Sequence, residues 1–131
     1  MFDLDSLRQQ LADKEAERQG YLDTAAAIGV IYDRLVEDKR AMKGYRKTVS
    51  DFIDEEYDSF KGDFHKNSYQ ASGANLLRSY DLVIGNIDTN MDRLNTAKCQ
   101  WENKAAQCVP VIGHLQSLIN SILTSLENQF N

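Results

Sequence analysis

The sequence predicts an all-α protein, a long antiparallel hairpin of two helices that pack as a coiled coil. Apolar residues recur at alternating steps of three and four along two stretches of nearly equal length, and this period is typical of coiled-coil helices. The stretches are separated by Phe60-Lys61-Gly62-Asp63, close to the middle of the 131-residue chain. Gly62 can adopt a positive φ and Asp63 is a favourable N-cap, so the turn motif is placed at Phe60 and Gly62.

The first helix is expected from about residue 5 to residue 60. Ser6-Leu7-Arg8-Gln9 fits a capping box, in which the Ser and Gln side chains satisfy free backbone N–H groups. Lys14 and Arg18 occupy two positions of the otherwise apolar seam. The other seam residues of this helix are Leu4, Leu7, Leu11, Tyr21, Ala25, Ile28, Tyr32, Leu35, Met42, Val49, Ile53 and Phe60.

The second helix is expected over about residues 74–127, after a turn at 61–66 that could extend to residue 73 because turn-forming residues cluster there. The whole chain, 1–131, is then a single helical hairpin domain. Pro110 should bend this helix. With the turn near residue 63, position i of the first helix faces about 126 − i of the second. Trp101 then lies opposite Ala25 and should be a buried core residue.

Charge divides the two halves of the chain. Residues 1–66 hold 11 Lys or Arg and 15 Asp or Glu, whereas residues 67–131 hold 4 and 5, and residues 105–126 hold none. A helix with a wide apolar surface and no charge needs more cover than one neighbouring helix provides. We therefore predict a partner interface at the end of the hairpin where the termini meet. Its residues are Val111, Leu115, Leu118, Ile119, Ile122, Leu123 and Leu126.

Several functional classes are disfavoured. The net charge of −5 argues against a nucleic-acid partner, and the uncharged stretch carries too many polar residues for membrane insertion. The N-terminal residues lack the basic and apolar segments of a signal peptide, which favours a cytoplasmic protein. Cys99 and Cys108, about 13 Å apart on one helix, are too distant for a disulfide. No catalytic, cofactor-binding or metal-binding motif is present, so an enzyme is not expected.

Phe60-Lys61-Gly62 between two long helices resembles the aromatic-x-Gly turn of the WXG-type hairpins of bacterial type VII secretion, with Phe where that family prefers Trp. Tyr69 lies near the place where that family has a second aromatic residue. The chain is most similar to the small YwqH-like helical proteins that accompany LXG-type toxins. This resemblance implies a targeting chaperone that binds the N-terminal helical domain of such a toxin, with a second small helical partner as an option.

The same resemblance implies an export signal, an aromatic residue with an acid four positions later, usually after the second helix. The C-terminal tail lacks it, whereas Phe52 with Glu56 has the spacing but precedes the turn. The protein would therefore stay in the cytoplasm or be co-secreted with its toxin. The alternative is a structural or scaffold coiled coil that associates with itself, for example as a homodimer.

Overall fold

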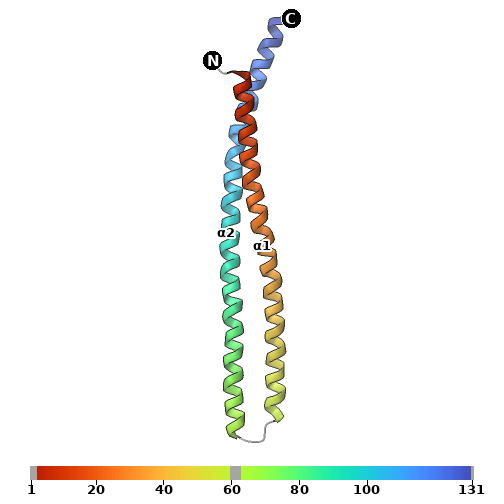
Figure 1. The fold of residues 1–131 in the computed structure, drawn as a ribbon, viewed down its shortest axis with the longest axis vertical. Coiled ribbons are helices and arrows are strands. Elements are labelled where there is room, and N and C mark those ends of the chain that lie inside the picture. Colours follow the sequence, from red (N-terminus) through yellow and green to blue (C-terminus); the bar gives the residue numbers. More distant parts are fainter. Residues whose placement is uncertain (1–2, 60–62, 131) are drawn as a thin grey trace. The chain divides into compact units, whose positions relative to one another are not determined.

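The protein consists of two long helices that pack against each other antiparallel (Figure 1). In this computed structural model α1 spans Leu4–Ser59 and α2 spans Asp63–Phe130. The structure describes the backbone of residues 3–59 and 63–130, and the side chains of residues 3–55 and 71–130. The predicted all-α helical hairpin is confirmed.

The N-terminus of α1 is capped by Asp3 rather than by the predicted Ser6. The Asp3 carbonyl accepts a hydrogen bond from the Leu7 N–H (2.9 Å), and its side-chain Oδ1 accepts a longer one from the Asp5 N–H (3.4 Å). An acidic side chain at this place satisfies a free N–H group and interacts favourably with the positive end of the helix dipole. α1 therefore begins about one turn earlier than a helix capped by Ser6 would begin.

The predicted turn residues Phe60 and Gly62 lie outside the described residues. Asp63 begins α2, in agreement with its expected role at a helix start. Residues 63–73 are helical, so α2 begins eleven residues before the expected residue 74, and neither the turn over 61–66 nor its extension to residue 73 is what the structure has. α2 continues through Pro110 and ends at Phe130, three residues beyond the predicted end.

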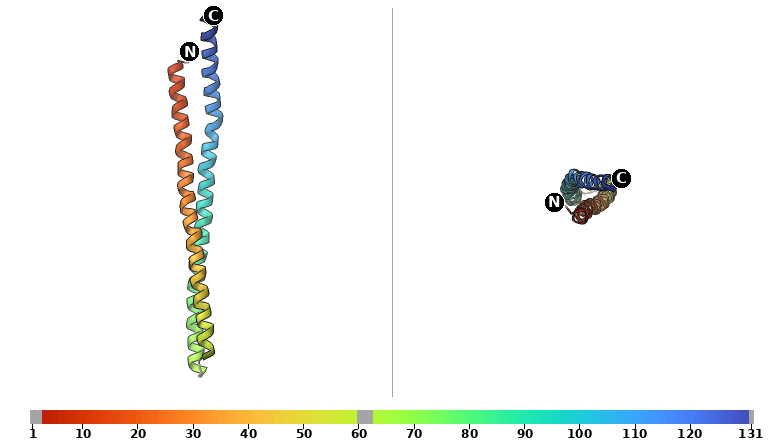
Figure 2. Two further views of the ribbon diagram at one scale, coloured as in Figure 1. Left: turned by 90° about the vertical axis from the view of Figure 1, so that its right-hand side faces the viewer. Right: turned by 90° about the horizontal axis from the view of Figure 1, so that it is seen from above.

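The helices form two compact units. The terminal unit contains Met1–Gly29 and Thr96–Asn131, and the turn unit contains Val30–Asn95. In the terminal unit the first residues of α1, coloured red, lie beside the blue C-terminal part of α2 (Figure 2). Both units thus combine a segment of α1 with a segment of α2.

Apolar burial characterises the terminal unit. Leu7 is 1% exposed and forms a core cluster with Leu115 and Ile119 of α2. The small residues Ala25, Ala105 and Cys108 are also buried. The cluster of Leu7 with Leu115 and Ile119 agrees with the predicted register, in which Leu7 faces residue 119.

Ion pairs join the two helices of the turn unit. Arg46 of α1 donates from Nε and Nη2 to the two carboxylate oxygens of Asp81 (2.6 and 3.1 Å), and Lys39 pairs with Asp88. Nearer the turn, Gly73 is buried against the side chain of Ile53. These contacts match the predicted register within one residue.

Candidate partner-binding surface

The uncharged residues 105–126 of α2 contribute both to the core and to the surface of the terminal unit. Leu115 and Ile119, which the sequence assigns to the partner interface, are instead buried against Leu7. The reason is the register, because Leu4 at the start of α1 lies opposite residue 122 and α1 therefore covers the seam up to that point. These two residues are core residues and not free surface.

Three other residues of the predicted interface have an intermediate position. Leu118, Ile122 and Leu123 are half-buried and pack against the same core cluster. Each therefore has an inner side in contact with the core and an outer side that is exposed. A substitution at any of them would affect the fold as well as the surface.

The remaining predicted residues, Val111 and Leu126, are exposed at 41% and 40%. Val109 at 51% and Phe130 at 86% are exposed as well, although the predicted interface does not include them. Leu126 and Phe130 continue the seam in steps of four beyond residue 122, where no residue of α1 lies opposite. This continuation of the period is the signal that could have identified Phe130.

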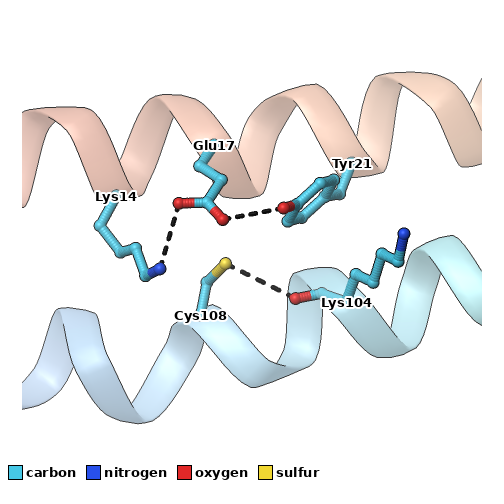
Figure 3. A network of polar contacts seen from close by, with 5 residues as sticks. All are labelled: Lys14, Glu17, Tyr21, Lys104 and Cys108. Carbon is cyan, nitrogen blue, oxygen red and sulfur yellow. Dashed lines mark hydrogen bonds and ion pairs between the residues drawn. The ribbon is translucent and has the colours of Figure 1, made fainter.

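Lys14, one of the two seam cations, is satisfied within α1 (Figure 3). Its Nζ lies 3.1 Å from Glu17 Oε2, and the Tyr21 hydroxyl donates to the other Glu17 oxygen at 2.8 Å. The hydrogen bonds from Tyr21 and Lys14 lower the pKa of Glu17, and the bond to Glu17 raises the pKa values of Lys14 and Tyr21. Lys14 is therefore an internally paired cation.

Arg18, the other seam cation, has a different environment. Its Nε atom is buried and has no hydrogen-bond partner among the described residues. A groove of about 400 Å³ lies beside it, lined by Glu15, Arg18 and Gln19 of α1 and by Val109 and Ile112 of α2. The predicted positions of Lys14 and Arg18 in the seam are correct, but only Lys14 has its charge paired in the described part of the chain.

Trp101 is half-buried rather than a fully buried core residue. Its ring is centred 5.7 Å from that of Tyr21, and the Lys104 Nζ lies 4.3 Å from the centre of the Trp101 ring. Ala25, which the register places opposite Trp101, is buried. The indole thus packs along the edge of the seam, where an aromatic ring and a cation share its surface.

The turn unit has a separate apolar groove of about 390 Å³. Phe52, the aromatic residue of the candidate export signal, is exposed and lines this groove together with Leu76 of α2. Glu56 belongs to α1, but its side chain lies outside the described ones. The proposed role of Phe52 and Glu56 remains a prediction.

The described part of the chain has no cluster of metal-ligating side chains. Within residues 3–55 and 71–130, no three His, Cys, Asp or Glu side chains are placed to hold a metal ion. Cys99 is exposed, whereas Cys108 is buried and its thiol donates to the Lys104 carbonyl at 3.5 Å. The view that the protein is not an enzyme stays an expectation from the sequence.

By length and composition alone, the part of α2 within Ala71–Phe130 is long and apolar enough to cross a membrane. Little of that stretch is buried inside the structure. Polar residues interrupt the uncharged residues 105–126, and five of them line a shallow hollow on α2 together with Gly113: Gln116, Ser117, Asn120, Ser121 and Thr124. The surface of α2 thus combines exposed apolar side chains with a hollow lined mainly by polar ones.

The fold and this surface define the molecule as an antiparallel two-helix hairpin with an incompletely covered α2. Comparison with protein-family models, with curated proteins and with solved structures gives no match.

Proposed function

We propose that the protein is a non-enzymatic helical partner whose terminal unit completes a helical bundle with another protein. The observation that carries the proposal is the exposure of Val109, Val111, Leu126 and Phe130 on a helix without charge between residues 105 and 126. Burying such side chains against another helix is favourable by about 25 cal/mol per Å² of apolar surface. Helices with an uncovered apolar face commonly bind a further helix in this way.

The resemblance of Phe60-Lys61-Gly62 to the WXG-type turn supplies the finer proposal. The partner would be the N-terminal helical domain of an LXG-type toxin, and the protein would act as its targeting chaperone for type VII secretion. Binding would take place before export, in the cytoplasm, and the exposed Phe52 would remain available to the secretion machinery.

A self-associating scaffold is the second candidate function. The same exposed residues support it, since Leu126 and Phe130 could be covered by a second copy of α2. The two functions differ in what the surface binds. Light scattering on the isolated protein measures this directly, because a scaffold forms a stable oligomer without any other protein.

The first experiment measures capture of the purified N-terminal helical domain of the LXG-type toxin that we expect to be encoded beside this gene. In the variant with Val111→Glu and Leu126→Glu, each carboxylate would have to be desolvated at an apolar contact. We expect Kd to rise at least about a hundredfold, which corresponds to about 2.8 kcal/mol. Helicity measured by circular dichroism should be unchanged because both side chains are already exposed.

Leu82→Glu is the matched control, because Leu82 is 67% exposed on α2 but belongs to the turn unit. It should leave capture unchanged. Equal capture by the double variant and the wild type would reject this surface as the binding site. If the wild type forms an oligomer and the double variant does not, the scaffold function is favoured. If the wild type binds phosphatidylcholine–phosphatidylglycerol vesicles, a membrane is favoured as the ligand of this surface.

A further inference from the structure

The terminal unit contains a seam cation, Arg18, that shares a groove with Glu15 but forms no ion pair with it. Arg18 has a buried Nε without a hydrogen-bond partner, and no ion pair reaches it among the described residues. The helix it faces cannot supply an acid, since residues 105–126 are uncharged. Lys14, one turn earlier in the same seam, is by contrast paired with Glu17.

An unsatisfied buried donor is unfavourable, and one that belongs to a charged group is more so. Guanidinium groups pair best with carboxylates, because two N–H donors match the two carboxylate oxygens. Glu15 does not pair with Arg18, and residues 105–126 of α2 offer no acid, so the natural complement of Arg18 is an Asp or Glu side chain from a partner.

The groove beside Arg18 shows where such an acid could approach. Glu15, Arg18 and Gln19 line its α1 side, and Val109 and Ile112 form its α2 side. Val109 is half exposed, so a helix bound in this groove would cover apolar surface. A side chain of the same helix would also reach the Arg18 guanidinium. All the residues that line the groove belong to the terminal unit.

We propose that the helical partner of the terminal unit seats a helix in this groove and places an Asp or Glu carboxylate on the Arg18 guanidinium. An apolar residue three or four positions from that acid would cover Val109, because side chains at this spacing share one face of a helix. This inference rests on the proposed function, in which the same unit binds a helical protein. It adds the chemistry of the partner helix, an acid next to an apolar anchor.

Such a pair would contribute more to specificity than to affinity. A desolvated ion pair gains little over apolar contacts of the same size, but a partner without the acid would leave Arg18 buried and unpaired. Arg18 would thus select the register of the bound helix and reject uncharged helices, including a second copy of residues 105–126.

The test uses Arg18→Met, which keeps an unbranched apolar side chain, shorter than that of Arg, and removes the charge. In the free protein the melting temperature should stay the same or rise, since an unpaired cation leaves the seam. Capture of the toxin's N-terminal helical domain should weaken at least about tenfold in Kd, because the partner's acid loses its counter-charge. The opposite directions of these two readouts separate a binding role from a structural one.

Lys14→Met is the matched control, because it removes a seam cation of the same unit that is already paired with Glu17. It should leave capture unchanged. Arg18→Glu should abolish capture, and replacing one particular Asp or Glu of the toxin domain by Arg should restore it. This rescue would identify the residue that contacts Arg18.

Three outcomes would overturn the inference while the proposed function stands. Arg18→Met could bind the domain as tightly as the wild type, or Lys14→Met could lose as much affinity as Arg18→Met. In the third outcome, Arg18→Met lowers both the melting temperature and the affinity. Failure of the wild-type protein to bind the domain would instead reject the proposed function, and the inference with it.

Discussion

The terminal unit and the turn unit use different interactions to hold the same two helices together. The buried apolar side chains of the described residues, among them Leu7 and Leu115, all belong to the terminal unit. In the turn unit, ion pairs such as Arg46–Asp81 join α1 to α2, whereas the ion pairs found among the described residues of the terminal unit stay within one helix. One hairpin thus contains an apolar half and a more polar half.

The difference follows from the charge distribution along α2. Where α2 lacks charge, its seam residues are buried against α1, and further apolar residues such as Val111 remain exposed. Where α2 carries Asp81 and Asp88, it is attached to α1 through exposed ion pairs, which contribute little to stability each. The comparison predicts that stability and partner binding are both concentrated in the terminal unit.

The largest expected effect is that of Leu7→Ala. Leu7 is the most buried large side chain of the core, so its truncation leaves a cavity and should lower the free energy of unfolding by about 2–5 kcal/mol. Ile84→Ala removes a half-buried seam residue of the turn unit and should have a smaller effect. Urea denaturation followed by circular dichroism measures both, and an equal loss in the two variants would contradict the difference between the units.

Gly73 of the turn unit lies close to the side chain of Ile53. A Cβ added there would lie 2.8 Å from Ile53 Cδ1 and 3.0 Å from its Cγ2, so Ile53 would have to move. Gly73→Ala should therefore destabilise the protein by about 1–2 kcal/mol, even though Ala is the better helix former.

Gly85→Ala is the control for Gly73→Ala, because a Cβ at residue 85 of the same helix would meet no atom within 4 Å. It should stabilise the protein by up to about 1 kcal/mol. If Gly73→Ala were stabilising to the same extent, the contact with Ile53 would not be close. The combination of Gly73→Ala with Ile53→Val should recover part of the lost stability, because it removes a methyl group from the contact.

The fold could be predicted from the sequence because a coiled-coil seam is a local, repeated signal. The heptad period determined both helices, and a turn near residue 63 determined the register that brings Arg46 beside Asp81. The N-terminal cap was predicted one turn late, since both Asp3 and Ser6 are good cap residues and local sequence does not choose between them.

The surface was harder to predict than the fold. The absence of charge in residues 105–126 indicated an unusual helix, but it could not distinguish the buried Leu115 from the exposed Val111. That distinction depends on how far α1 extends along α2 and on which flank of the seam a residue lies. Arg18 was recognised as a seam residue, whereas its lack of a partner depends on the paths of individual side chains.

The smallest expected effect concerns the Arg46–Asp81 pair. Its hydrogen bonds lower the pKa of Asp81 and raise that of Arg46. A carboxyl group with a lower pKa in the folded state stabilises that state above its unfolded-state pKa, and the contribution disappears as the pH falls through the folded-state pKa. The pair is exposed, so added salt should weaken its contribution further.

Asp81→Asn removes this titration and the interhelical pair. Its urea midpoint should lie slightly below that of the wild type at about pH 7, and the difference should shrink as the pH approaches about 3. Asp51→Asn is the control, because the Lys47–Asp51 pair lies within one turn of α1 and does not join the helices. A constant difference across this pH range would mean that Asp81 stabilises the turn unit through packing rather than charge, and the contrast between the two units would then rest on apolar burial alone.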